Sequence, residues 1–409
     1  MASSSSSSPK TPVLSPHLIV IFLATIILLP SNTHASLRKF KSIISFGDSL
    51  ADTGNLARVF PSLDIASDLG NFLQLPYGET FFHRPTGRWS NGRLVIDFIA
   101  QKFGLPFIRP FLGSCADGNA FGCTIDDFRH GVNFAVAGAT ALDKEFFDKY
   151  GVEITFPFAS LKNQLSWFEH QFLPVVCLEP QDCKTYLENT LFFVGEIGGN
   201  DYNDPFFKSN KTLDVVQEFI PHVVKAITST VVELIKLGAK TLIVPGNFPI
   251  GCNSKYLTKY QSSNKSDYDP ETGCLNWLNE LSRQHNMALR AQLGCIQNQN
   301  PNVAIVYADN YGASMRLYHN PEKFGFSRLG SLYSCCGGEG PYNISLTTNC
   351  GSPGSYTCPD PSKYICWDGL HFTEAANRHI ANILVEESFD GPTLTDEGYH
   401  CSSDMVTDV

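Results

Sequence analysis

Three residues stand in sequence contexts that suit nucleophilic catalysis. Ser49 follows a Gly-Asp pair directly after an apolar run, and Asp368 precedes His371 with Gly369 and one further residue between them. A serine hydroxyl is a weak nucleophile at neutral pH, so it needs a base and a group that orients the base. Gly369 permits a bent loop that brings the carboxylate onto the imidazole. We therefore expect Ser49 to be the nucleophile, His371 the base and Asp368 its partner.

Two further residues could bind the negative charge that develops on an ester carbonyl oxygen. Asn200 follows two glycines shortly after the apolar run 191–194, and Gly138 follows the apolar run 132–136. The side-chain amide of Asn200 and the backbone N–H of Gly138 are the expected donors.

Each of these residues also has an ordinary structural interpretation. Ser49 could cap the start of a helix, and Asp368 could cap the helix expected from Thr373 onward. Gly-Gly-Asn at 198–200 is a common turn sequence. The catalytic interpretation is favoured because all the required parts occur in one chain.

Short apolar segments alternate with longer segments of helical periodicity. The expected strands are 42–46, 132–136, 191–194, 241–244 and 303–307. The expected helices are 94–102, 161–172, 215–237 and 275–297, with a kink at Pro221. Alternation of this kind predicts parallel strands in a three-layer α/β/α sandwich. Because ligands bind at the carboxyl ends of parallel strands, the position of Ser49 favours a function there.

The first 35 residues have the pattern of a secretory signal peptide. A Ser-rich start is followed by the apolar run 18–29 and by a small-residue exit that ends at Ala35. A membrane anchor is the alternative, but the run is shorter than the roughly 20 apolar residues that a span needs. We expect a secreted protein, with the vacuole as an alternative destination.

The rest of the chain, 36–409, has no linker-like stretch and no internal repeat. We expect one domain with two long inserts, 57–92 and 326–366. Loops of this length are uncommon unless they serve a site or are held by cross-links.

Composition excludes several classes of partner. Acidic residues outnumber basic ones by 40 to 30, and no basic cluster is interleaved with aromatic residues, so a nucleic-acid partner is not expected. We expect a monomer that acts on a small-molecule ester and does not insert stably into a membrane.

Thirteen cysteines in a chain with a secretion signal indicate disulfides. Zinc is the alternative, but no C-x-x-C pair or cluster of histidines supports it, so no metal is expected. The close spacing suggests the pairs Cys115–Cys123, Cys177–Cys183 and Cys350–Cys358. The odd count leaves at least one cysteine unpaired or bridged to another chain, and the adjacent Cys335 and Cys336 are the candidates.

Three sequons lie in polar segments that suit exposed loops. Their acceptor residues are Asn210, Asn264 and Asn343. We expect glycosylation at these positions.

Four segments together resemble the signature blocks of plant GDSL esterases of the SGNH hydrolase superfamily. They are FGDSLADTGN at 46–55, GVNFAVAGAT at 131–140, GGND at 198–201 and WDGLHFT at 367–373. The segment PYGETFFHRPTGRWSNGR at 76–93 is also similar, and the likeness is greatest to the subgroup that contains sinapine esterase and acetylajmalan esterase. Many relatives read Ser-Gly-Gly-Ala where this chain has Val-Ala-Gly-Ala at 136–139.

The resemblance implies a flavodoxin-like sandwich with a mainly parallel, five-stranded sheet and no metal or cofactor. It implies catalysis by Ser49, Asp368 and His371, with an oxyanion hole formed by the N–H of Ser49, Gly138 and Asn200. The implied function is a secreted serine carboxylesterase of small acyl or phenolic esters, which could include a plant specialised metabolite. A lipase, an acyltransferase and a catalytically silent protein that binds esters or glycans are the alternatives.

Overall fold

The computed structural model describes residues 40–59, 70–113 and 123–390, together with the single residues 1, 394 and 401. The predicted signal peptide and Cys115 lie outside the described residues. Residues 39–409 group together as one unit by their internal contacts, and the description below concerns this unit.

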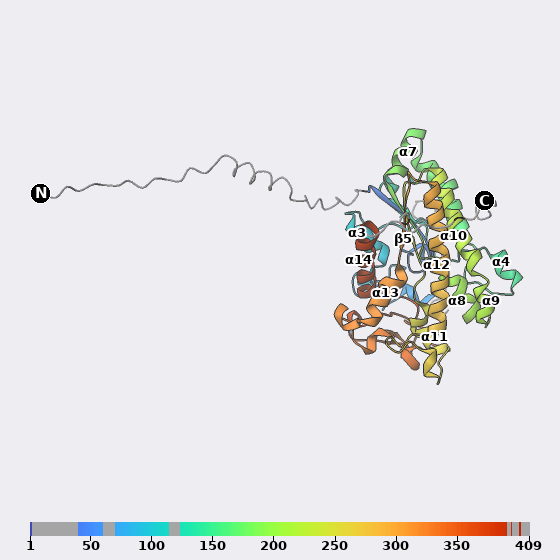
Figure 1. Ribbon diagram of the computed structural model, residues 1–409, viewed down its shortest axis with the longest axis vertical. Coiled ribbons are helices and arrows are strands. Elements are labelled where there is room, and N and C mark those ends of the chain that lie inside the picture. Colours follow the sequence, from blue (N-terminus) through green and yellow to red (C-terminus); the bar gives the residue numbers. More distant parts are fainter. Residues whose placement is uncertain (2–39, 60–69, 114–122, 391–393, 395–400, 402–409) are drawn as a thin grey trace. The chain divides into compact units, whose positions relative to one another are not determined.

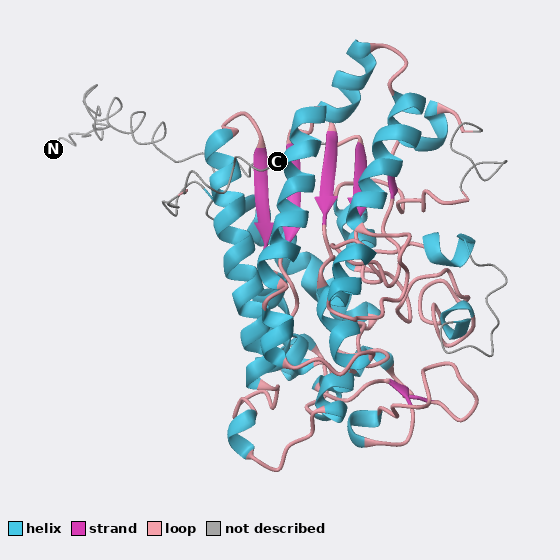
Figure 2. Cartoon of the chain, turned by 90° about the vertical axis from the view of Figure 1, so that its right-hand side faces the viewer, coloured by secondary structure: helices cyan, strands magenta, loops and turns pink. Residues whose placement is uncertain are grey.

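Five parallel strands form the central sheet. The strands are β1 Ser42–Phe46, β2 Gly131–Asn133, β3 Thr190–Val194, β4 Thr241–Pro245 and β5 Ala304–Ala308. They lie in the order β2-β1-β3-β4-β5, and Figure 2 shows them as magenta arrows that point in the same direction. This is the strand order of flavodoxin-like folds, so the predicted fold class is confirmed.

Helices cover both faces of the sheet. The helices α3 Val95–Lys102, α13 Asn310–His319 and α14 Glu374–Asp390 lie on one side of β5, and α10 Ile220–Leu237 and α12 Asn276–Gln299 lie on the other (Figure 1). The remaining helices are α2 Asn55–Val59, α4 Lys144–Lys149, α5 Leu161–Trp167, α6 Leu173–Val176, α7 Pro180–Glu188, α8 Gly199–Phe207, α9 Leu213–Gln217 and α11 Ser254–Lys259.

Side chains of the central strands alternate between two hydrophobic cores. Ile43 and Phe193 pack with α3 and α14, whereas the neighbouring Ile44 and Phe192 pack with α10 and α12. Strands that are buried on both faces read as continuous apolar runs, which is why 42–46 was recognisable from sequence. Each fully buried side chain of this size contributes about 1.5–3 kcal/mol.

The expected strand 132–136 is too long. The strand β2 ends at Asn133, whose Oδ1 accepts a hydrogen bond from the N–H of Ala135 at 2.8 Å. The Nδ2 of Asn133 donates to the carbonyl of Ala51 at 2.5 Å. The backbone still donates to the β1 segment beyond this point, from Phe134 N to Ser45 O at 2.7 Å and from Val136 N to Gly47 O at 3.1 Å, so the chain stays beside β1 up to the turn before Gly138.

Two expected helices are interrupted. Instead of one helix over 161–172, the α-helix ends at Trp167 and a π-helical turn, Phe168–Phe172, follows it. The expected helix 215–237 is divided into α9 and α10. Pro221 lies in the first turn of α10, where its missing N–H has no helical partner to lose, so it starts the helix and does not kink it.

The two inserts meet each other beside the carboxyl edge of the sheet. The second insert contains a short antiparallel pair, β6 Cys336–Gly337 and β7 Tyr356–Thr357. Asn71 of the first insert donates to Ser352 Oγ at 2.6 Å, and Gln74 donates to the carbonyl of Gly351 at 3.0 Å. The two inserts are therefore tied to each other by side-chain hydrogen bonds, while disulfides cross-link the second insert internally.

Five disulfides each join two described cysteines. The pairs are Cys177–Cys183, Cys252–Cys274, Cys295–Cys401, Cys335–Cys358 and Cys336–Cys350. The expectation of disulfides is confirmed, including the pair Cys177–Cys183. The expected pair Cys350–Cys358 is wrong, because each of these residues is bonded to one of the two adjacent cysteines. Within the described residues the free thiol is the buried Cys366, so the expectation that it was Cys335 or Cys336 is also wrong.

The sequons differ in exposure. Asn210 and Asn264 are exposed, as expected. Asn343 is partly buried, and its Nδ2 donates to the carbonyl of Ser334 at 3.1 Å, so the expected exposure is wrong there. Glycosylation of the three residues stays a prediction.

Within the described residues, no helix is long and apolar enough to cross a membrane. The same residues contain no group of three or more His, Cys, Asp or Glu side chains arranged to hold a metal ion.

The disulfides of the second insert yield a prediction about stability. We expect a Cys336→Ala, Cys350→Ala double variant to lose about 3 kcal/mol of unfolding free energy, because this bond closes a short loop. Urea unfolding of both proteins measures the loss. A chelator added to the wild type should leave its unfolding unchanged. If the chelator lowered stability and a divalent ion restored it, a metal would have to contribute to holding the insert.

Candidate active site

Ser49 lies in a sharp turn at the carboxyl end of β1. The turn depends on Gly47, whose φ of 147° and whose close approach to the carbonyl of Gly195 leave no room for a side chain. Gln164 holds this glycine from both sides, because its Oε1 accepts from Gly47 N at 2.9 Å and its Nε2 donates to Gly47 O at 2.8 Å. The hydroxyl of Ser49 is thereby presented at the edge of the sheet.

The three predicted catalytic side chains form one chain of hydrogen bonds. Ser49 Oγ and His371 Nε2 are 2.8 Å apart, although the residues are separated by 322 positions. On the other side of the ring, His371 Nδ1 lies 2.8 Å and 2.7 Å from the two oxygens of Asp368. A positive φ of 103° at Gly369 permits the bend between them. Thr373, and not Asp368, accepts from the first turn of α14, so Asp368 is not the cap of that helix.

Asp368 is buried and remains charged. Burial raises the pKa of its carboxyl group, but the neighbouring His371 and the hydrogen bonds from His371 and Tyr77 outweigh this effect and lower the pKa to about 2. The backbone N–H of His371 also donates to Oδ1 at 3.0 Å. The carboxylate is therefore ionised throughout the physiological pH range and can hold the imidazole in a fixed orientation.

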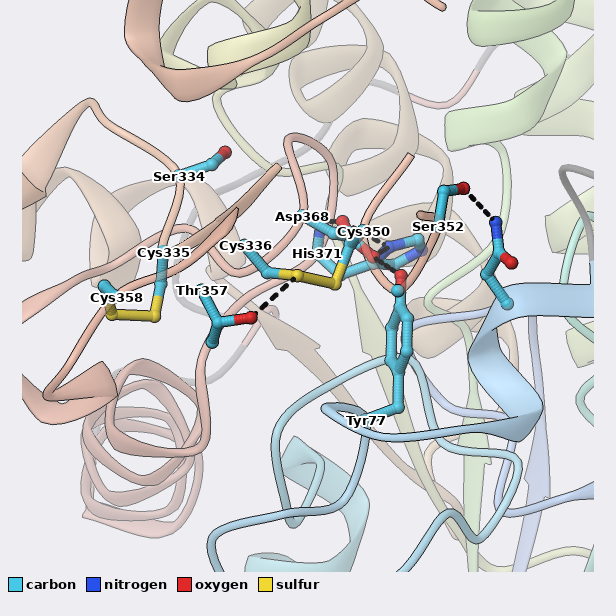
Figure 3. Close-up of a disulfide and its surroundings, with 12 residues drawn as sticks. Tyr77, Ser334, Cys335, Cys336, Cys350, Ser352, Thr357, Cys358, Asp368 and His371 are labelled. Carbon is cyan, nitrogen blue, oxygen red and sulfur yellow. Dashed lines mark hydrogen bonds and ion pairs between the residues drawn. A yellow bond between two sulfur atoms is a disulfide. The ribbon is translucent and has the colours of Figure 1, made fainter. Parts of the chain in front are cut away.

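Tyr77 is a residue of the site that sequence reasoning missed. Its hydroxyl donates to Asp368 Oδ2 at 2.8 Å, and the two side chains face each other in Figure 3. The ring of Tyr77 packs edge-on against Trp89 and Trp367, and Trp89 in turn lies 5.0 Å from the ring of His371. The similarity of 76–93 to the family was the available signal, but no spacing rule connects Tyr77 to a partner 291 residues away.

The predicted oxyanion donors lie beside Ser49. Asn200 is in the first turn of α8, and its Nδ2 donates to the carbonyl of Ala139 at 2.9 Å. Gly138 has a φ of 78°, and an added Cβ would approach the ring of Phe156 to 2.6 Å, so glycine is required there. Ser49, Gly138 and Asn200 line the same cavity. Among the described residues, none accepts a hydrogen bond from the backbone N–H of Ser49 or Gly138.

Buried carboxyl groups fix the loop that carries Gly138. Asp52 Oδ2 accepts from the N–H of Ala137 at 2.9 Å, and Asp201 Oδ2 accepts from the N–H of Ala141 at 2.8 Å. Burial raises the pKa of both groups, that of Asp201 to about 7. These aspartates, which were not among the expected site residues, therefore have a structural role on both sides of the glycine.

The five predicted residues meet in a cavity of about 430 Å³. This volume is within the range of small-molecule sites. Aromatic side chains contribute much of the wall, and polar groups are placed among them. The aromatic residues are Phe72, Tyr77, Trp89, Phe156, Phe207, Phe248 and Phe372.

A parallel α/β sandwich with serine, histidine and aspartate connected in this order at its carboxyl edge has the architecture of a serine hydrolase. Comparison with known proteins agrees. The model of the GDSL-like lipase/acylhydrolase family matches residues 43–384, so the chain belongs to this family. The family expected from the sequence is confirmed, and the protein is a serine hydrolase that acts on carboxylic ester bonds.

The chain aligns with its relatives over almost the whole length of both proteins. A GDSL esterase/lipase of Arabidopsis thaliana is 47% identical over 384 residues, which cover 94% of this chain and 93% of the relative. Sinapine esterase of Brassica napus is 44% identical over 371 residues, or 90% of each protein.

Tyr77→Phe tests whether the tyrosine hydroxyl supports the reaction through Asp368. We expect kcat to fall about tenfold with KM little changed, because a hydrogen bond to a buried charged group is lost while the ring still packs. Steady-state kinetics on a small ester measures the effect. Tyr186→Phe is the matched control, since Tyr186 donates to the carbonyl of Phe128 away from the cavity. Equal kinetics of wild type and Tyr77→Phe would contradict the role.

Proposed function

We propose that the protein is a secreted carboxylesterase that hydrolyses small acyl or phenolic esters through an acyl-enzyme on Ser49. The observation that carries the proposal is the continuous path from Ser49 Oγ through His371 to Asp368, with 2.8 Å between the hydroxyl oxygen and the imidazole nitrogen. A base within this distance can remove the hydroxyl proton as the oxygen attacks a carbonyl carbon.

The proposed reaction has two halves. In the first, His371 takes the proton of Ser49, the serine oxygen bonds to the acyl carbon, and the N–H groups of Ser49, Gly138 and Asn200 stabilise the oxyanion. The imidazolium then protonates the departing alcohol and leaves the acyl group on the serine. In the second half, His371 removes a proton from water, whose oxygen attacks the acyl carbon; the bond from that carbon to Ser49 Oγ then breaks, the imidazolium returns the proton to Ser49 Oγ, and the acid is released.

The size of the cavity favours small substrates. A volume of about 430 Å³ with a largely aromatic wall suits a compact acyl or phenolic group. The name of one relative, sinapine esterase, refers to a particular ester, and a substrate of comparable size is proposed for this chain.

Secretion is supported by the signal-like start of the chain and by the disulfides, which form in oxidising compartments. We propose that residues 36–409 form the mature enzyme as one domain, and that glycans are attached at the predicted sequons.

Ser49→Ala tests the nucleophile directly. We expect a fluorophosphonate probe to label the wild type at Ser49 and the variant not at all, because only an activated serine reacts with it. Turnover of a short-chain ester should fall by several orders of magnitude while folding is kept. A purified Ser49→Ala protein that hydrolysed esters at the wild-type rate would remove Ser49 from the mechanism.

Asn200→Ala separates an oxyanion donor from a residue needed only for the turn. Gly198, with φ of 103°, already supplies the unusual backbone conformation before the helix. We therefore expect kcat to fall about 10²- to 10³-fold with little change in KM, because the amide acts mainly on the charge of the transition state. Kinetics and a thermal melt are measured together. A normal kcat with a lowered melting temperature would assign Asn200 to the turn alone.

A further inference from the structure

Three asparagines in the cavity wall have side-chain amides without a partner in the described part of the chain. They are Asn247, which follows β4, Asn253, which precedes α11, and Asn349 of the second insert. The Nδ2 atom of Asn247 is buried, and no described residue accepts a hydrogen bond from it. An unpaired buried amide is unfavourable unless a ligand or water completes its hydrogen bonds.

Other asparagines of the same cavity are used by the protein itself. Asn71 donates to Ser352 Oγ at 2.6 Å, and Asn203 accepts from the hydroxyl of Tyr256 at 2.8 Å. The three amides named above differ from these neighbours, because no described residue uses their hydrogen-bonding capacity.

The backbone of Asn247 is held firmly. Its N–H donates to Asn286 Oδ1 at 2.6 Å, and its carbonyl accepts from Asn286 Nδ2 at 2.9 Å. The buried side chain of Asn286 thus binds both the backbone N–H and the backbone C=O of Asn247. The side chain of Asn247 therefore extends from a fixed backbone position.

The other two asparagines are each next to a disulfide. Asn253 comes directly after a cysteine that is bonded to Cys274, and Asn349 comes directly before a cysteine that is bonded to Cys336. Binding groups that are already fixed lose less conformational entropy when a ligand binds. Three unpaired amides, each beside an anchor, have the properties of a preformed polar subsite.

The charged groups of the wall are already engaged. Lys208 donates to Thr155 Oγ1 at 2.6 Å and lies 3.5 Å from Asp204 Oδ1, and the ammonium group of Lys255 packs 5.2 Å from the ring of Phe207. The subsite is therefore defined by neutral amides, each of which offers both donors and an acceptor. Hydroxyl groups, which donate and accept, are their complement, whereas an alkyl chain would leave the amides unpaired.

The position of Asn349 also indicates which part of the ester lies beside the three amides. The neighbouring disulfide is drawn beside Asp368 and His371 in Figure 3, and Cys350 lines the same cavity as His371. Because the histidine protonates the departing alcohol in the proposed mechanism, the alcohol part of the substrate is on this side. Phe72, which is stacked on Trp89, and Phe248 also line the cavity and make part of its wall apolar.

We propose that Asn247, Asn253 and Asn349 bind the alcohol part of the ester, and that this alcohol is a ring compound rich in hydroxyl groups, such as a glycosyl or cyclic polyol. The inference rests on the proposed function and names its substrate class.

A matched pair of acetates tests the proposal. One is a methyl glucoside acetylated on its primary hydroxyl, and the other is cyclohexylmethyl acetate, which has the same acyl group and a six-membered ring without hydroxyls. We expect kcat/KM to be about tenfold or more higher for the glucoside, because each unpaired amide penalises the hydrocarbon ring.

Variants assign the effect to the amides. Asn253→Ala and Asn349→Ala should each raise KM for the glucoside about tenfold and lower KM for cyclohexylmethyl acetate, because the amide that the hydrocarbon ring leaves unpaired is removed. Asn320→Ala is the matched control, because Asn320 also precedes a short helix without a side-chain cap bond, but it is exposed and outside the cavity wall. Its kinetics should equal those of the wild type on both esters.

Three outcomes would overturn the inference. They are equal or lower kcat/KM for the glucoside, unchanged glucoside KM in both variants, and equal losses on both esters, which would make the amides structural. In each case Ser49-dependent hydrolysis of cyclohexylmethyl acetate would leave the proposed function standing. If the folded wild type hydrolysed neither acetate and did not react with a fluorophosphonate, both proposals would fail.

Discussion

One buried negative charge, the carboxylate of Asp368, governs how this structure is assembled. An isolated carboxylate in a protein interior costs several kcal/mol, so its donors have to be in place when it is buried. His371 supplies two of them from the same loop, but Tyr77 reaches it from an insert 291 residues earlier in the chain. Folding of the first insert against the last loop is therefore coupled to formation of the site. The same contacts keep the pKa of Asp368 near 2 despite burial.

Asp48, which precedes Ser49 in the chain, has an environment that raises its pKa instead of lowering it. Burial, and then the nearby Asp201 and Asp52, raise the pKa of Asp48 to about 8, and its one backbone donor, Leu50, does not compensate. The raised pKa favours the neutral form of Asp48, which is adjacent to Ser49, the proposed nucleophile. A second full negative charge there would oppose the charge that develops on the substrate oxygen. Two environments, one rich in donors and one poor, thus shift the pKa values of Asp368 and Asp48 in opposite directions.

The sequence predicted structure well where a segment is buried along its whole length or where the interacting residues are close together in the chain. The strand 42–46 was predicted to the residue because both of its faces are buried, and the Asp368 loop was recognisable because its partners are within three positions. The expected end of the second strand was wrong, since the strand ends at Asn133, whose side chain accepts a hydrogen bond from the N–H of Ala135. The disulfide pairing and the contact between Tyr77 and Asp368 depend on how distant loops pack against each other. No periodicity or spacing within one loop indicates such packing.

The residues of the proposed reaction and those that line the rest of the cavity are fixed in place by different kinds of structure. Ser49, Gly138 and Asn200 follow strands of the sheet, so the rigid hydrogen-bonded ladder fixes their mutual geometry. Much of the remaining wall comes from long connections, which have no ladder and are held by disulfides and side-chain amides instead. Loops supported in this way tolerate sequence change without moving the strand ends. The fold can therefore keep one reaction while its connections select the ester, because each half of the site has its own source of rigidity.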